Sequence, residues 1–206
     1  MKILFQGDSI TDAARDKRNY HHMGNGYPKF ASALIAEAHP DTDFEFINFG
    51  ISGNRTCQVF DRLTSDGIAF APDIFSILIG INDIWHRYNA ANPIATSDEQ
   101  IALNYRMILS EIRKKTNAKI IMLQPFLLDA PDKEHMRRDL ETVIPIVDAL
   151  AEEFADVYIR LDEKFAEALK TQPTPKFYSA DGVHPNENGS AFIGKLYAEA
   201  VETLLK

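Results

Sequence analysis

The chain has 206 residues, close to the length of one ordinary domain, and 45% of them are hydrophobic, which excludes disorder as its main state. The formal net charge of −8 argues against nucleic acid or an anionic membrane surface as a partner, because both bind basic surfaces. We therefore expect a single globular domain spanning residues 1–206.

The sequence contains no pattern typical of a disulfide framework or of membrane targeting. Its one cysteine, Cys57, excludes an internal disulfide, and a lone cysteine is more often a small core residue than a nucleophile. The longest apolar run, residues 74–81, is far too short to cross a bilayer, and no apolar signal-peptide segment is visible near residue 1. We expect a cytoplasmic protein that binds neither membrane nor nucleic acid.

Strand-like runs alternate with helical patterns along the chain. In chain order, the predicted elements are a strand at 2–6, a helix at 27–38, strands at 44–49 and 73–79, a helix at 97–115, a strand at 119–125, a helix at 136–154, a strand at 157–161 and a helix at 191–205. Pro145 lies inside the third helix and is expected to kink or split it. Apolar strands that alternate with helices indicate an α/β domain with about five parallel strands and helices on both faces.

Four clusters of small and polar residues recur at related places in this pattern. Residues 7–9, 50–54 and 80–83 each follow a predicted strand, and residues 181–185 precede the last helix. In a parallel sheet the ligand site lies outside the carboxyl ends of the strands. We therefore expect the four clusters to meet in one site.

The first and last clusters contain the residue types of nucleophilic catalysis. Ser9 is a candidate nucleophile, but a free hydroxyl reacts poorly without a base, and His184 is a suitable base near neutral pH. A tight turn at Gly182 would bring Asp181 to the imidazole, where its carboxylate would fix the tautomer and stabilise the imidazolium. Pro185 favours an extended backbone at His184.

The middle clusters offer hydrogen-bond donors. The N–H groups of Gly53 and Ser9 and the side-chain amide of Asn82 would make three donors for a developing oxyanion. Each residue also has an ordinary structural interpretation: a serine after a strand usually belongs to a turn, and Asn82 could cap a helix. We expect Asp8 and Asp12 to accept hydrogen bonds from loop backbone. The joint order and placement of the candidates, rather than any one of them, favours catalysis.

The four clusters resemble the four sequence blocks of the SGNH hydrolases, also called the GDSL esterase family. The matching segments, in the family's order, are GDSIT, GISGN, GIND and DGVHP. The resemblance implies a nucleophilic Ser9, oxyanion donors at Gly53 and Asn82, a base at His184 and a triad acid at Asp181. It also implies a flavodoxin-like α/β/α sandwich and a carboxylic ester hydrolase that works through an acyl-enzyme intermediate without a cofactor or metal.

A narrower resemblance concerns the substrate. The segments GDSITD and IGINDIWHRY, and PF followed later by MRR, are similar to those of the bacterial intracellular acetylxylooligosaccharide esterases. That resemblance implies a small acetyl ester as substrate, with the acetyl groups on sugars or oligosaccharides, and assembly as a homo-oligomer. Trp85, three residues after Asn82, would then bind substrate as an apolar wall or as a platform for a sugar ring. A partly buried core aromatic is the ordinary alternative.

Three other functions remain open from the sequence. SGNH hydrolases of the lysophospholipase or thioesterase type would act on longer acyl chains, and a carbohydrate-binding module would bind without catalysis. A metallophosphatase could use Asp8, Asn82 and His184, but it would leave Ser9 and Gly53 without a role. The sequence has no G-x-S-x-G nucleophile elbow, no glycine-rich nucleotide motif and no compact metal-ligand spacing.

Overall fold

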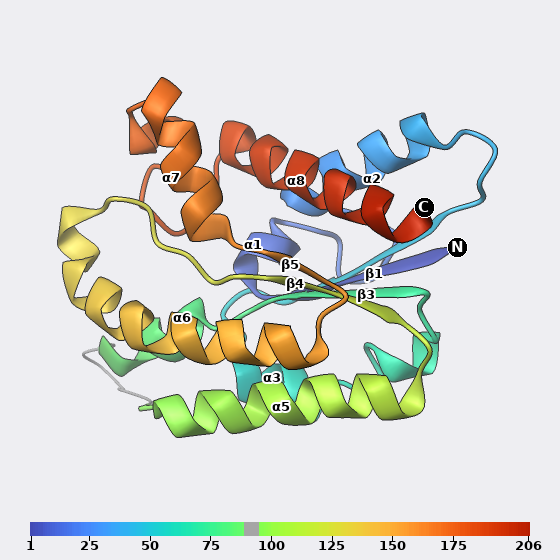
Figure 1. The fold of residues 1–206 in the computed structure, drawn as a ribbon, viewed down its shortest axis with the longest axis horizontal. Coiled ribbons are helices and arrows are strands. Elements are labelled where there is room, and N and C mark those ends of the chain that lie inside the picture. Colours follow the sequence, from blue (N-terminus) through green and yellow to red (C-terminus); the bar gives the residue numbers. More distant parts are fainter. Residues whose placement is uncertain (89–94) are drawn as a thin grey trace.

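A parallel five-stranded sheet forms the centre of the computed structural model, which describes residues 1–88 and 95–206 (Figure 1). The strands are β1 (Lys2–Gly7), β2 (Glu45–Gly50), β3 (Ile74–Leu78), β4 (Lys119–Leu123) and β5 (Val157–Ile159). Their order in the sheet is β2-β1-β3-β4-β5, the order of flavodoxin-like sheets. This arrangement confirms the expected α/β/α fold and all five predicted strands.

Helices cover both faces of the sheet. Figure 1 shows α2 (Tyr27–Ala38), α7 (Leu161–Thr171) and α8 (Glu187–Leu205) on one side, and α3 (Thr56–Asp61), α5 (Asp98–Lys115) and α6 (Glu134–Phe154) on the other. Two short helices, α1 (Ser9–Asp12) and α4 (Ile81–Trp85), follow β1 and β3 directly. Single 3₁₀ turns cover 68–70, 86–88, 131–133 and 175–177. None of the helices in the described ranges is long and apolar enough to cross a membrane.

Local chemistry explains the start of α5 and the continuity of α6. Ser97 caps α5 by accepting a hydrogen bond from the Gln100 N–H, and Asp98 and Glu99 lie in the positive first turn of the helix. In α6 the chain stays helical through Pro145. Pro145 lies on the exposed face, where water can bond the carbonyl that the proline leaves without its N–H partner. The helix is therefore not split.

The first strand is anchored deeply in the core. Ile3, Leu4 and Phe5 are all 0% exposed, and burial of each such side chain contributes about 1.5–3 kcal/mol relative to its exposure to water. β1 lies between β2 and β3 in the sheet. The loop that starts at Gly7 is therefore attached to a rigid, central element.

Candidate active site

Three of the four polar clusters meet at one edge of the sheet because their strands are neighbours. β2, β1 and β3 run parallel and adjacent, so residues 7–9, 50–54 and 80–83 leave the sheet on the same side. The fourth cluster is held beside the loop that follows β4, where the Leu128 N–H donates to the Gly182 carbonyl over 2.8 Å. The fold thus brings together segments from both ends of the chain.

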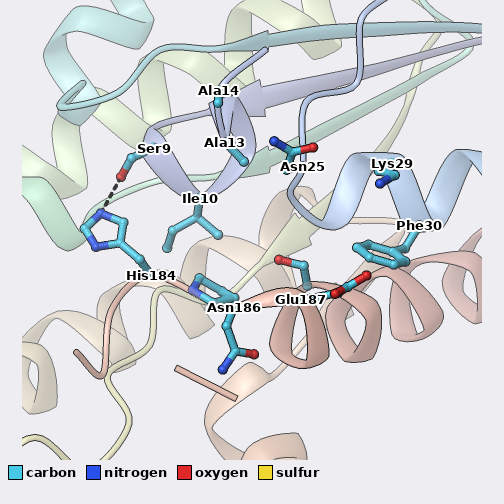
Figure 2. Close-up of a pocket in the computed structure, with 12 residues that line it drawn as sticks. Ser9, Ile10, Ala13, Ala14, Asn25, Lys29, Phe30, His184, Asn186 and Glu187 are labelled. Carbon is cyan, nitrogen blue, oxygen red and sulfur yellow. Dashed lines mark hydrogen bonds between the residues drawn. The ribbon is translucent and has the colours of Figure 1, made fainter. Parts of the chain in front are cut away.

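Ser9, His184 and Asp181 form a continuous hydrogen-bonded row. Ser9 Oγ lies 3.0 Å from His184 Nε2, and His184 Nδ1 lies 2.8 Å from Asp181 Oδ2 (Figure 2 shows the first contact). The carboxylate contact fixes the tautomer that has its hydrogen on Nδ1, which leaves Nε2 able to accept the serine proton. The row has the order and the distances that serine nucleophiles use.

The turn from Asp181 to His184 holds the carboxylate in an ionised state. Partial burial acts to raise the pKa of Asp181, but hydrogen bonds from the His184 side chain and from the N–H groups of His184 and Val183 outweigh it and lower the pKa to about 2. Gly182 has a φ of 83°, and a Cβ atom there would lie 2.7 Å from Ala130 Cβ. The turn therefore requires glycine for both its conformation and its space.

Ser9 is the first residue of α1, and Asp8 caps that helix. Asp8 Oδ1 accepts a hydrogen bond from the Ile10 N–H over 3.0 Å, whereas Oδ2 has no partner in the part of the chain that the structure describes. Burial raises the pKa of Asp8 to about 7. Asp8 lines neither of the cavities next to Ser9, so it is not available as a ligand for a substrate or metal ion.

Three hydrogen-bond donors surround the serine. The N–H groups of Ser9 and Gly53 donate to no acceptor within residues 1–88 and 95–206. Asn82 uses one amide hydrogen to donate from Nδ2 to the Asn54 carbonyl over 3.1 Å, which leaves its other hydrogen available. Gly53 has a φ of 81° and open space at its Cβ position, so conformation alone favours glycine there.

Two buried carboxylates hold the Gly53 loop in position. Asp12 Oδ2 accepts hydrogen bonds from the N–H and the hydroxyl of Ser52 at 2.9 and 2.7 Å. Asp83 accepts from the N–H and the hydroxyl of Thr56 at 2.9 and 2.7 Å. These contacts confirm that Asp12 accepts from loop backbone, but the part played by Asp83 and Thr56 was not predicted. The only sequence signal for this contact is that an acid, Asp83, directly follows Asn82.

The same carboxylates differ in their ionisation. Desolvation acts to raise the pKa of Asp12, but the hydrogen bonds from Ser52 and the nearby Lys17 ammonium together lower it. Burial raises the pKa of Asp83, against the opposing effect of its hydrogen bonds from Thr56. Asp12 therefore fixes the loop as a charged acceptor at neutral pH.

Trp85 and the proposed donors line one cavity. Its volume is about 510 Å³, and it is bordered by Ser9, Gly53, Asn82, Trp85 and His184. The Trp85 ring is half-buried against the core, and its centroid lies 5.9 Å from that of the His184 ring. Trp85 therefore packs against the core and also lines the cavity, and its contact with substrate stays a prediction.

Other candidate chemistry does not reach this site. Cys57 is half-buried and lines neither cavity. Within the described ranges, no group of three or more His, Cys, Asp or Glu side chains is arranged to hold a metal ion. Of Ser9 and Cys57, Ser9 is the one whose side chain lies within hydrogen-bond distance of an imidazole.

Comparison with known proteins agrees with the fold and shows the family. The sequence profile of the GDSL-like Lipase/Acylhydrolase family matches residues 5–192. An acetylxylan esterase of Geobacillus stearothermophilus is 30% identical over 97% of this chain and 93% of its own length. Its crystal structure has a TM-score of 0.87 at 29% identity, over the same shares of the two chains.

A second solved structure is also similar in fold. A Parabacteroides merdae protein described as a GDSL-like lipase has a TM-score of 0.91 at 31% identity, covering 98% of this chain and 95% of that one. Both the family profile and the relatives extend over nearly the whole chain. The chain belongs to the GDSL-like lipase/acylhydrolase family, the SGNH hydrolases, and is a carboxylic ester hydrolase.

Proposed function

We propose that the protein is a serine esterase that removes short acyl groups, above all acetyl groups, from sugars or oligosaccharides. The observation that carries the mechanism is the row of hydrogen bonds from Ser9 Oγ through the His184 imidazole to the Asp181 carboxylate. In this row Ser9 is the nucleophile, His184 the general base and Asp181 the group that orients the base.

Acylation starts with an ester carbonyl carbon against Ser9 Oγ. His184 Nε2 takes the hydroxyl proton as the oxygen attacks, and Asp181, ionised at neutral pH because of its low pKa, stabilises the imidazolium. Negative charge develops on the carbonyl oxygen, which accepts hydrogen bonds from the N–H groups of Ser9 and Gly53 and from the Asn82 amide. His184 then gives the proton to the alcohol oxygen, the ester bond breaks and the alcohol leaves.

Deacylation repeats the same steps with water. His184, neutral again, removes a proton from a water molecule as it attacks the acyl-Ser9 carbonyl. The same three donors stabilise the second oxyanion. Return of the proton to Ser9 Oγ releases the carboxylic acid and regenerates the enzyme, so the cycle needs no cofactor.

Three lines of support favour acetylated sugars as substrates. The Geobacillus stearothermophilus relative is named an acetylxylan esterase and, in another structure, an acetyl-xylooligosaccharide esterase. The net charge of −8 gives this protein no electrostatic attraction to anionic lipid surfaces. Trp85, beside Asn82, forms the wall against which a short acyl group packs.

The nucleophile is tested by Ser9→Ala, with Cys57→Ser as the control that alters the other potential nucleophile. Hydrolysis of 4-nitrophenyl acetate should fall by at least about 10³-fold in kcat for Ser9→Ala, because triad residues act as a unit, and should be unchanged for Cys57→Ser. A loss of less than about tenfold in Ser9→Ala, only ~1.4 kcal/mol of barrier, would show that Ser9 is not the nucleophile.

The acyl group is tested with 4-nitrophenyl esters of acetate, butyrate and octanoate, followed by acetylated xylooligosaccharides and a lysophospholipid. We expect the highest kcat/KM for acetate and turnover of the acetylated sugars. Preference for octanoate, or acceptance of the lysophospholipid with refusal of the sugars, would instead favour the long-chain alternative while leaving the serine mechanism intact.

A further inference from the structure

A second cavity borders the serine, and Trp85 is not among the described residues that line it. Its volume is about 590 Å³, and it lies between α1, the first turn of α2 and the first turn of α8 (Figure 2). This volume is typical of small-molecule sites, which range from about 300 to 1,000 Å³. Among the described residues that line the two cavities, only Ser9 and His184 belong to both. The reacting pair therefore lies where two cavities adjoin.

The proposed chemistry assigns different parts of an ester to the two cavities. Gly53 and Asn82 lie in the cavity with Trp85, so the carbonyl oxygen points into that cavity. The alcohol oxygen must lie near His184 Nε2, which protonates it as it leaves. The chain after His184 continues as Pro185 and Asn186 along the second cavity. An alcohol that leaves past His184 has its remaining atoms there.

The walls of the second cavity have the chemistry of a site for hydroxyl groups. The side chains of Asn25, Lys29 and Glu187 are exposed and line this cavity. Figure 2 draws one hydrogen bond among its labelled residues, between Ser9 and His184, and none from these three side chains. Figure 2 shows Lys29 and Glu187 at the end of the cavity away from Ser9, with Ile10 between. Ammonium and amide donors with carboxylate acceptors match the mixed donor and acceptor pattern of a polyol.

The charged and aromatic residues of the second cavity favour a neutral ligand with hydroxyl groups. One positive and one negative side chain, Lys29 and Glu187, balance each other, so the cavity has no net charge to select a charged alcohol such as a phosphate ester. Phe30 is half-buried in the wall beside Lys29, whose ammonium lies 5.6 Å from the ring centroid. A neutral ring with several hydroxyl groups could hydrogen-bond the polar side chains and pack against Phe30, whereas a fatty acyl chain would leave the polar groups without partners.

We propose that the cavity between α1, α2 and α8 binds the sugar portion of the ester, and that Lys29 and Glu187 hydrogen-bond its hydroxyl groups and set the specificity for the alcohol. This assignment rests on the serine esterase function proposed above. It gives the two cavities distinct tasks, with the acyl group beside Trp85 and the sugar beside α2 and α8.

The test compares two acetyl esters that differ only in the alcohol, acetylated xylobiose and 4-nitrophenyl acetate. We expect Lys29→Ala and Glu187→Ala each to lower the ratio of kcat/KM for acetylated xylobiose to that for 4-nitrophenyl acetate about tenfold, the effect of one lost charge-assisted hydrogen bond. Lys195→Ala on α8 and Glu37→Ala on α2 are matched controls, because both side chains are exposed and lie outside the cavity. Both controls should keep the wild-type ratio.

A second readout does not depend on turnover of the sugar ester. Xylobiose itself should inhibit hydrolysis of 4-nitrophenyl acetate competitively, and its inhibition constant should rise in Lys29→Ala and Glu187→Ala but not in the controls. If wild type cleaves acetylated xylobiose while both variants keep the ratio and inhibition constant of the controls, the sugar site is wrong and the esterase function stands. If wild type refuses the sugar ester, or Ser9→Ala remains active, the proposed function itself fails.

Discussion

Replacement of Asp8 by asparagine should make the stability of the protein less dependent on pH. Asp8 is 0% exposed, and burial raises its pKa from the ordinary 3.8 to about 7. One carboxylate oxygen accepts the Ile10 N–H, and the other has no partner among the described residues. An ionised carboxylate is poorly compensated at this position, so the folded protein favours protonated Asp8.

The magnitude follows from the pKa. A rise from 3.8 to about 7 corresponds to about 4 kcal/mol of free energy. Because the folded protein binds this proton more tightly than the unfolded chain does, the stabilising contribution is fully present below about pH 4 and is lost as the pH rises through about 7. Of this total, about 2.5 kcal/mol is lost between pH 5 and pH 8.

Urea unfolding of wild type and Asp8→Asn at pH 5, 6, 7 and 8 measures the effect. Asparagine can still accept the Ile10 N–H but does not titrate, so the free energy of unfolding of the variant, relative to wild type, should rise by about 2.5 kcal/mol from pH 5 to pH 8. The buried amide adds an offset that is independent of pH and cancels in this comparison. Parallel pH curves for the two proteins would refute the conclusion that Asp8 is protonated in the fold.

Three further predictions concern catalysis. Asp12→Ala should lower kcat about 10- to 100-fold with little change in KM, because Ser52 loses both hydrogen bonds and the Gly53 N–H is no longer held in place. Asp12→Asn should recover most of the lost kcat, whereas an equal loss in both variants would contradict a positioning role for Asp12. Asn82→Ala should lower kcat about 10²–10³-fold at nearly constant KM in 4-nitrophenyl acetate hydrolysis, whereas a raised KM with unchanged kcat would make Asn82 a ground-state contact. Prolonged treatment with EDTA should leave turnover unchanged, and a loss that an added divalent cation restores would argue for a metal-dependent reaction.

The sequence predicts the sheet well because its strands are buried on both faces. Consecutive buried residues leave apolar runs in β1, β3 and β4, and the predicted α2 has the observed bounds, Tyr27–Ala38. The predicted starts of α6 and α8 are late, because the residues that they omit, 134–135 and 187–190, are polar or small and carry no apolar periodicity. The helices α3 and α4 span 6 and 5 residues, too short for a periodic signal.

Some features of the site could be predicted from local sequence patterns, and others depend on long-range packing. The meeting of residues 7–9, 50–54 and 80–83 was predictable, because clusters that follow parallel strands share one edge of the sheet. Residues 181–185 follow no strand, so only the resemblance to the four sequence blocks indicated that His184 lies beside Ser9. The hydrogen bonds from Ser52 to Asp12 were only partly predictable, since the sequence indicates an acceptor but not which loop it holds. The second cavity depends on how the first turns of α2 and α8 lie side by side, and no local pattern in the chain encodes that packing.

The distance along the chain between Ser9 and His184 has a consequence for the way activity appears during folding. The two residues are 175 positions apart, and α8, which begins three residues after His184, packs against α2. Contacts of such long range form late, because closure of the intervening chain must be compensated by packing that is already in place. Esterase activity should therefore return after helix content in a refolding experiment. In a nascent chain Ser9 is made 175 residues before His184, so under the proposed mechanism the chain gains activity only after His184 has been made and α8 has docked.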